Sequence, residues 1–251
     1  MKGRYLAITL GLMLAGFGAG AQKTTEHDEL TWLGVLNQTR LSDRWGIWLD
    51  AHLRFHDNFT GEVSQFIGRA GPIFYLTDDI RLTAAYAYIH HFPAEGHKNI
   101  ARPEHRPWQQ IQWFTRGKQA TLMQWVRLEE RYRRKILDDN SLDAGYLFNW
   151  RVRYNFALFV PITKKRFAPG GLQFLLNDEV MINFGEKIIF NHFDQNRLFA
   201  GLVYQVNKHA QLHAGYMNLY QQLPAGNVFN SQHAIRIFYF HNLDLRKPEK
   251  G

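Results

Sequence analysis

Arginine and glutamate side chains occupy alternate positions in residues 125–134, whose sequence is WVRLEERYRR. One row of alternate positions contains Arg127, Glu129, Arg131 and Arg133, and the positions between them are mostly apolar or aromatic. The planar guanidinium group pairs in bidentate geometry with carboxylate or phosphate oxygens. This row therefore predicts either a binding surface for an anionic solute or a network of internal ion pairs.

Two later segments carry rows of the same kind. Arg151, Arg153 and Asn155 alternate with apolar residues in one segment, and Asn177 and Glu179 do so in the next. Only an extended strand places alternate residues on opposite faces, so all three segments predict strands. Consecutive strands are neighbours in a meander, and we therefore expect all of these polar side chains to face one interior.

Two interpretations of this arginine-rich interior remain open. In the first, the interior is a basic lumen that selects an anionic solute, or one that is gated by a network of ion pairs. In the second, paired side chains fill a narrow barrel and the interior is a structural plug. Glu129 and Glu179 would then neutralise the arginines, because an uncompensated buried guanidinium group is costly.

The elements that must position these side chains are strands throughout the chain. The cleanest alternation lies in residues 44–56, whose apolar row consists of Trp45, Ile47, Leu49, Ala51, Leu53 and Phe55. In a soluble sandwich such a row faces a core. In an outer-membrane barrel it faces lipid, and the polar row faces the lumen. Aromatic residues make up 15% of the chain, which suits the aromatic girdles of such barrels.

The connections between the predicted strands alternate in length. Tight turns are predicted at 41–43, 77–79, 117–119 and 207–209, with the longer connection 161–171 as an exception. Longer loops are predicted at 57–62, 93–106, 135–142, 185–194 and 223–230. Short periplasmic turns that alternate with longer extracellular loops are typical of outer-membrane barrels. We therefore expect an all-β protein that forms a closed antiparallel transmembrane β-barrel.

The number of strands is a separate prediction. Eleven segments of the chain have the pattern of a strand. Closed single-chain bacterial barrels have even strand numbers, so we expect about twelve strands, with ten as the alternative. The missed or merged strand would lie near residues 22–40 or 143–171.

Residues 1–21 predict a cleaved signal peptide. The chain begins with basic residues, continues with an apolar run and reaches Ala19-Gly20-Ala21, so cleavage is expected after Ala21. Residues 22–251 contain no uncharged stretch of membrane-helix length, and such a chain can be embedded in a membrane only as a barrel. We therefore predict one barrel domain over residues 22–251, located in the outer membrane of a Gram-negative envelope.

The composition argues against several other classes of protein. Removal of residues 1–21 lowers the net charge from +8 to +6, and the basic residues form no clustered stripe of the kind that binds nucleic acid. Four histidines fall in or beside the loop predicted at 93–106, namely His90, His91, His97 and His105. Their spacings match no metal-ligand signature and the chain has no cysteine, so no metal or other cofactor is expected.

Several segments together resemble a known family. They are Trp32, the turn Ser42-Asp43-Arg44-Trp45, and the segments PEHRPWQQ (103–110), RLEER (127–131) and RVRY (151–154). Over essentially its whole mature length the chain resembles the bacterial outer-membrane family catalogued as domain of unknown function 2490. The resemblance implies a transmembrane β-barrel and implies no activity, because none is assigned to that family.

These observations predict a porin-like pore or solute-binding channel for a small anionic solute, or else a structural envelope protein, surrounded by outer-membrane lipid and lipopolysaccharide. The alternative is a hydrolase that modifies lipid or lipopolysaccharide. Ser231 and His233 lie two residues apart on one strand face, with Asn230 adjacent, and could pair for nucleophilic catalysis. The sequence places no third member at a defined position, so no catalytic residue is assigned.

Overall fold

The computed structural model describes residues 24–59 and 61–246, so the predicted signal peptide lies outside the described residues. The described chain forms eleven strands joined by turns and loops. The strands are β1 (Thr24–Arg40), β2 (Trp45–Phe55), β3 (Val63–Tyr75), β4 (Ile80–His91), β5 (Arg102–Arg116), β6 (Thr121–Ile136), β7 (Leu142–Pro161), β8 (Leu172–Phe184), β9 (Phe193–Gln205), β10 (Ala210–Gln222) and β11 (Val228–Asp244). No helix in this part of the chain is long and apolar enough to cross a membrane.

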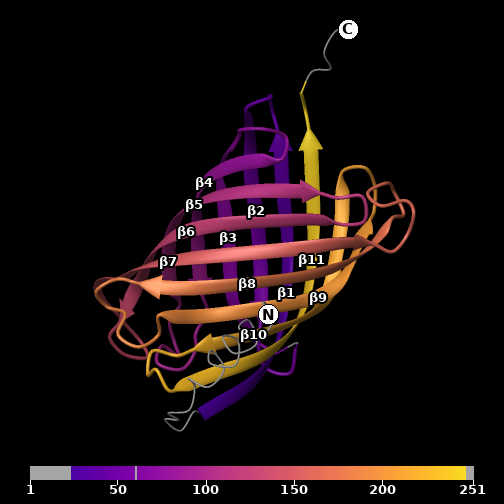
Figure 1. Cartoon of the computed structure of the whole chain (residues 1–251). Helices are drawn as coiled ribbons and strands as arrows, with labels where there is room; N and C mark the ends of the chain where they lie inside the picture. The colour runs from indigo at the N-terminus through magenta and orange to yellow at the C-terminus, as the bar shows by residue number, and fades with distance from the viewer. Residues whose placement is uncertain (1–23, 60, 247–251) are drawn as a thin grey trace, which may run out of the picture.

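The strands close into one barrel in which each strand pairs with the next along the chain (Figure 1). β1 and β11 complete the closure by parallel pairing, from Thr24 opposite Val228 to Arg40 opposite Asp244. All other strand pairs are antiparallel. In Figure 1 the strands β5–β8 cross β1–β3 at a steep angle, which is the arrangement of strands tilted around a barrel axis.

The closed all-β barrel is confirmed, but the described residues form eleven strands, which is neither the expected twelve nor the alternative of ten, and the closing pair is parallel and not antiparallel. Successive hairpins reverse the strand direction. In a meander with an odd number of strands the first and last therefore run the same way, and only parallel pairing can close the barrel. The described residues of the two regions predicted to hold a missed strand contain no additional one, because residues 24–40 form β1 alone and β7 extends unbroken over 20 residues.

The two rows of side chains on each strand differ in exposure. On β2, Trp45 and Leu49 are 52% and 49% exposed on the outer face, whereas Asp50 and His52 are buried on the inner face. On β7, Arg151 is buried and its apolar neighbours face outward. On both strands the outer face is therefore apolar and the charged side chains lie inside, which is the reverse of a soluble sandwich.

The connections divide the barrel into two ends, named here the short-turn end and the long-loop end. The connections of the short-turn end are 41–44, 76–79, 117–120, 162–171 and 206–209. Those of the long-loop end are 56–62, 92–101, 137–141, 185–192 and 223–227. Four of the five short-turn connections have four residues, and no long-loop connection has fewer than five. The predicted alternation is confirmed, including its exception.

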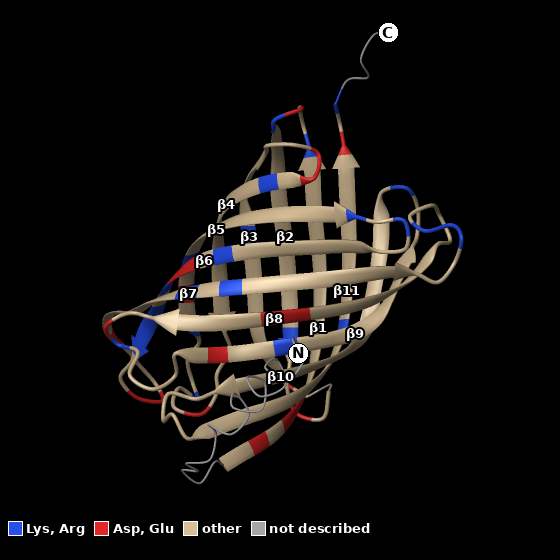
Figure 2. Cartoon of the chain, viewed as in Figure 1, with Lys and Arg blue, Asp and Glu red and all other residues tan. Residues whose placement is uncertain are grey.

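The connections at the two ends also differ in charge (Figure 2). Those of the short-turn end contain six basic and three acidic residues, whereas those of the long-loop end contain two basic and six acidic residues. Half of the basic residues at the short-turn end lie in the connection 162–171, as Lys164, Lys165 and Arg166. The barrel therefore has a basic rim and an acidic rim.

Candidate functional site

The nine polar residues predicted from β6, β7 and β8 all lie on the inner face of the barrel. Eight of them are buried, namely Arg127, Glu129, Arg131, Arg151, Arg153, Asn155, Asn177 and Glu179. The ninth, Arg133, lies near the end of β6 and is half-buried. Inward positions on these adjacent strands lie opposite one another in the register, so the structure brings the nine side chains into one cluster.

Glu129 is the centre of an ion-pair network that joins neighbouring strands. Arg151 Nη2 lies 2.5 Å from Glu129 Oε2, and Arg153 Nη1 lies 2.6 Å from Glu129 Oε1. Arg153 also pairs with Glu179 on β8, and Arg197 Nη1 on β9 lies 3.5 Å from the same carboxylate. The network therefore links β6, β7, β8 and β9 across the interior.

Two further carboxylates, which the sequence analysis placed in loops, belong to this network. Glu104 is fully buried, and its Oε1 accepts hydrogen bonds from Arg106 Nη2 at 2.7 Å and from Arg131 Nε at 2.8 Å. Asp194 Oδ2 accepts a hydrogen bond from Arg151 Nη1 at 2.6 Å. These contacts extend the network from β5 to β9.

The signal for Glu104 was present in the sequence. β5 begins at Arg102, which is five residues before the predicted strand start at Pro107. Glu104, Arg106 and Trp108 occupy alternate positions of this strand and face the interior. The prolines of the segment concealed the alternation, because proline is unusual inside a strand.

Of the four histidines in or beside the loop predicted at 93–106, three lie in strands and one lies in the loop. His90 and His91 belong to β4 and His105 belongs to β5, whereas His97 is buried within the loop. His91 Nε2 lies 3.2 Å from Glu104 Oε2 and is part of the interior network. Within the described residues no group of three or more His, Cys, Asp or Glu side chains could hold a metal ion.

Six interior arginines of the described chain have no carboxylate oxygen within hydrogen-bond distance: Arg54, Arg81, Arg102, Arg127, Arg133 and Arg236. Three of them, Arg54, Arg127 and Arg236, stack directly on an aromatic ring. Each donates to a side-chain amide oxygen instead, as Arg236 Nη1 does to Asn177 Oδ1 at 3.3 Å. Arg127 Nη1 lies 3.9 Å from Glu129 Oε1, which is too far for a hydrogen bond. One buried nitrogen of each guanidinium group donates to no atom of the described chain.

Aromatic rings position these three guanidinium groups. Arg127 Cζ lies 3.8 Å from the ring centroid of Trp108, and Arg54 stacks in the same way on a tryptophan ring. Arg236 Cζ lies 3.5 Å from the ring centroid of Phe199. Cation–π attraction orients a guanidinium group, but the ring carries no net charge, so it does not neutralise the positive charge.

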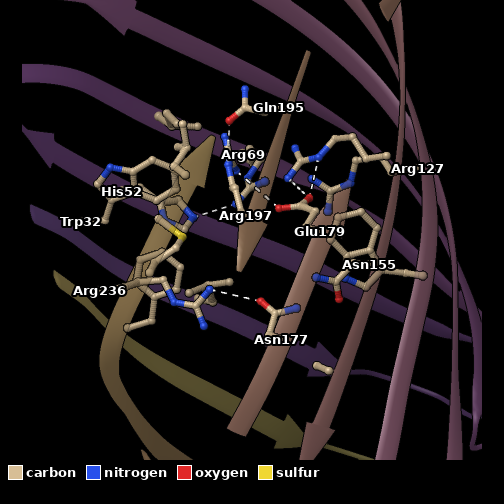
Figure 3. A pocket seen from close by; sticks show the side chains of 18 of the residues that line it. Trp32, His52, Arg69, Arg127, Asn155, Asn177, Glu179, Gln195, Arg197 and Arg236 are labelled. Carbon is tan, nitrogen blue, oxygen red and sulfur yellow. Dashed lines mark hydrogen bonds and ion pairs between the residues drawn. The ribbon is translucent and has the colours of Figure 1, made fainter. Parts of the chain in front are cut away.

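The interior encloses a cavity of about 860 Å³ whose lining reaches both ends of the barrel, with Pro224 at the long-loop end and Phe167 at the short-turn end. Thirteen arginines and no lysine of the described chain line it. Four carboxylates also line it, and three more lie buried in the wall, as Asp50, Glu104 and Glu129. Figure 3 shows arginines from several strands pointing towards one space. The cavity is therefore lined by an excess of positive charge.

Ser231 and His233 lie on the outer face of β11 and show no catalytic arrangement. Asn218 Nδ2 donates to Ser231 Oγ at 3.3 Å, and His233 Nδ1 lies 2.5 Å from the hydroxyl of Tyr216. No hydrogen bond joins Ser231 to His233 within the described residues, and Asn230 Oδ1 is buried without a partner there. The structure does not bring the three candidate residues of the hydrolase together.

At the two rims, carboxylates are held in their charged form by local hydrogen bonds. Arg40 Nη1 donates to Asp78 Oδ1 at 2.6 Å at the short-turn end, and this contact holds the pKa of Asp78 below its usual value. At the long-loop end the pKa of Asp138 is also lowered, because its carboxylate accepts hydrogen bonds from the backbone N–H of Asn140 and the hydroxyl of Ser141.

Comparisons with known proteins address the family of the chain. Searches of the curated proteins and of the solved structures each found no match. A family model described as "Protein of unknown function (DUF2490)" matches residues 29–230. The match extends from β1 to the start of β11 and includes all nine predicted interior residues. It covers most of the chain and confirms the predicted family, so the chain belongs to the family described as Protein of unknown function (DUF2490).

Proposed function

We propose that the protein is a transmembrane β-barrel of the outer membrane whose interior binds and passes a small anionic solute. The outward rows support the membrane placement, because exposed side chains such as Leu49 and Ile182 would contact acyl chains. The closure of β1 on β11 supports it as well, since a strand in hydrocarbon must satisfy its backbone hydrogen bonds. Residues 1–21 would serve as the signal peptide that directs export.

The observation that carries the solute-binding role is the excess of arginine around the cavity. A structural plug would pair each buried guanidinium group with a carboxylate, because removing one partner of a buried ion pair costs about 3–5 kcal/mol. Arg127 and Arg236 line the cavity without such a partner in hydrogen-bond range. An anionic solute would supply the missing negative charge. Arginine suits this role because its guanidinium group stays charged when it is removed from water.

The paired arginines have a different role in this proposal. Arg151 and Arg153 are satisfied by Glu129, Glu179 and Asp194, so they hold the barrel wall in shape. The interior then combines a brace of paired charges with a smaller set of cationic positions that have no carboxylate within hydrogen-bond distance. This combination reconciles the two interpretations of the arginine-rich rows.

Single-channel recording tests the proposal. Refolded protein in a planar bilayer under a KCl gradient should give stepwise conductance with a reversal potential that shows preference for chloride. Arg127→Gln should reduce that preference, because it removes a charge from the cavity wall. Lys118→Gln is the matched control, since it removes one positive charge from a turn outside the cavity lining. Cation preference, or a barrel that neither conducts nor binds chloride, would reject the proposal.

A further inference from the structure

One wall of the cavity is apolar, although a passage for hydrated ions has no need of such a wall. The apolar residues form a continuous cluster contributed by β6 to β11 together with β1. The members that also line the cavity include Met123, Ala157, Phe159, Leu175, Met217 and Phe238. Apolar surface in contact with water is unfavourable, so this wall favours a ligand that has an apolar part.

Arg236 lies within this apolar wall. Its single hydrogen bond in the described chain runs from Nη1 to Asn177 Oδ1 at 3.3 Å, and Figure 3 shows the two side chains facing each other. The centroids of the Phe199 and Phe238 rings lie 3.5 Å and 5.1 Å from its Cζ atom. An arginine with five N–H donors thus keeps most of them unpaired beside an apolar surface.

The position of Arg236 is built into the backbone of the wall. Gly201 on β9 lies directly opposite Gly215 on β10, and a Cβ atom at these positions would lie 2.5 Å and 2.9 Å, respectively, from Cζ of Phe199. The two glycines therefore make the space in which the Phe199 ring lies. The guanidinium group of Arg236 stacks on that ring.

A second polar group at the same cavity has an unsatisfied hydrogen-bond acceptor. Asn155 is 4% exposed, lines the cavity, and its Oδ1 atom has no hydrogen-bond partner in the described chain. Figure 3 places its amide on the same side as Asn177. A buried amide without a partner is costly, and a polar ligand group or water would satisfy it.

We infer that the cavity binds a single-chain amphiphile with a carboxylate head group, as in a fatty-acid anion. The carboxylate contacts Arg236 near Asn177, and the acyl chain lies against the apolar wall. The inference rests on the proposed function, because it names the class of anion that the interior takes. A cavity of about 860 Å³ lies within the range of roughly 300–1,000 Å³ that encloses small ligands. Each methylene removed from water adds to the affinity, whereas a short hydrated anion gains nothing from the apolar wall.

Calorimetric titration of the full chain in lipid nanodiscs tests the inference, with protein-free nanodiscs as the blank. The ligands are decanoate, decanol and acetate, so that one control lacks the charge and the other lacks the chain. Decanoate should bind at least about tenfold more tightly than decanol, because decanol lacks the charge-assisted hydrogen bond. It should also bind at least about tenfold more tightly than acetate, because acetate has no methylene groups to bury against the apolar wall. Equal affinity for decanoate and decanol, or for decanoate and acetate, would overturn the inference.

Variants locate the two parts of the site. Arg236→Gln should weaken decanoate binding by about tenfold or more, while Arg246→Gln, outside the cavity lining, should leave it unchanged. Met123→Gln keeps the size of the side chain and should weaken decanoate without affecting acetate. If Arg236→Gln fails to fold, the ligand series on the unaltered chain still decides. If the barrel conducts chloride selectively but does not prefer decanoate, this inference alone is overturned. If it shows neither chloride selectivity nor a preference for decanoate, the proposed function is overturned as well.

Discussion

Arg151 on β7 and Glu129 on β6 lie directly opposite each other in the strand register, and Arg151 Nη2 contacts Glu129 Oε2 at 2.5 Å. Both side chains are almost completely buried. A shift of one residue in the pairing of these strands would turn one row of charges to the outer face. This ion pair therefore specifies the register of β6 and β7 as well as the electrostatics of the interior.

Glu129→Gln should destabilise the barrel. The substitution leaves Arg151 and Arg153 with one negative charge fewer between them, and breaking a buried pair typically costs about 3–5 kcal/mol. The free energy of unfolding in urea, measured on the refolded protein, should fall by an amount of that order. Glu186→Gln is the matched control, because Glu186 is exposed in a connection at the long-loop end. Equal stability of the two variants would show that the network is not a brace.

Arginine substitutions on the outer face should impair membrane insertion. Leu49 and Val152 lie on the outward rows of β2 and β7, and an arginine near the bilayer midplane costs roughly 2–4 kcal/mol. Leu49→Arg and Val152→Arg should therefore reduce the folded fraction in liposomes, as judged by heat-modifiable mobility in gels. Leu137→Arg, in a connection where the side chain is 67% exposed, should insert normally. Normal insertion of all three variants would contradict the membrane placement.

The pKa of Asp78 should depend on Arg40. The hydrogen bond and charge of Arg40 lower the pKa of Asp78 in the folded protein. The pair therefore stabilises the fold at pH values above the ordinary pKa of an aspartate carboxyl group. That contribution is lost as the pH falls through the lowered value. In an NMR titration, Arg40→Gln should raise the pKa of Asp78 towards its usual value and leave that of Asp138 unaffected. No change at Asp78 would mean that the ion pair does not form in solution.

The orientation of the barrel can be tested by cysteine labelling, because the chain has no cysteine of its own. Lys187 is exposed at the long-loop end and Lys208 is exposed at the short-turn end. If the long loops are extracellular, a membrane-impermeant maleimide added to intact cells should label Lys187→Cys and spare Lys208→Cys. Both variants should react after the cells are lysed. The opposite result would invert the proposed orientation.

The sequence by itself determined the strands and their faces. The period of two in the rows of Arg151 and Leu49 is compatible only with extended backbone, and the side of each row follows from its polarity. Strand ends were located to within a few residues for most elements, since turn-forming residues interrupt the alternation. Glu104 was missed because nearby prolines obscured a pattern that was nevertheless present, and Asp194, Arg197 and Arg236 were not singled out either.

The tertiary structure decided which interior charges are neutralised and how the barrel closes. Asp194 is 43 residues from Arg151 in the chain, and Asn177 is 59 residues from Arg236, so no local pattern relates them. The parallel pairing of β1 with β11 joins the two ends of the described chain and depends on the parity of the strand number. The alternation of polar and apolar residues along a strand indicates which face of the sheet a side chain occupies. Only the three-dimensional register determines what lies across the cavity from that side chain. In the case of Arg236, the register places an amide and an aromatic ring, and no carboxylate, within reach of the guanidinium group.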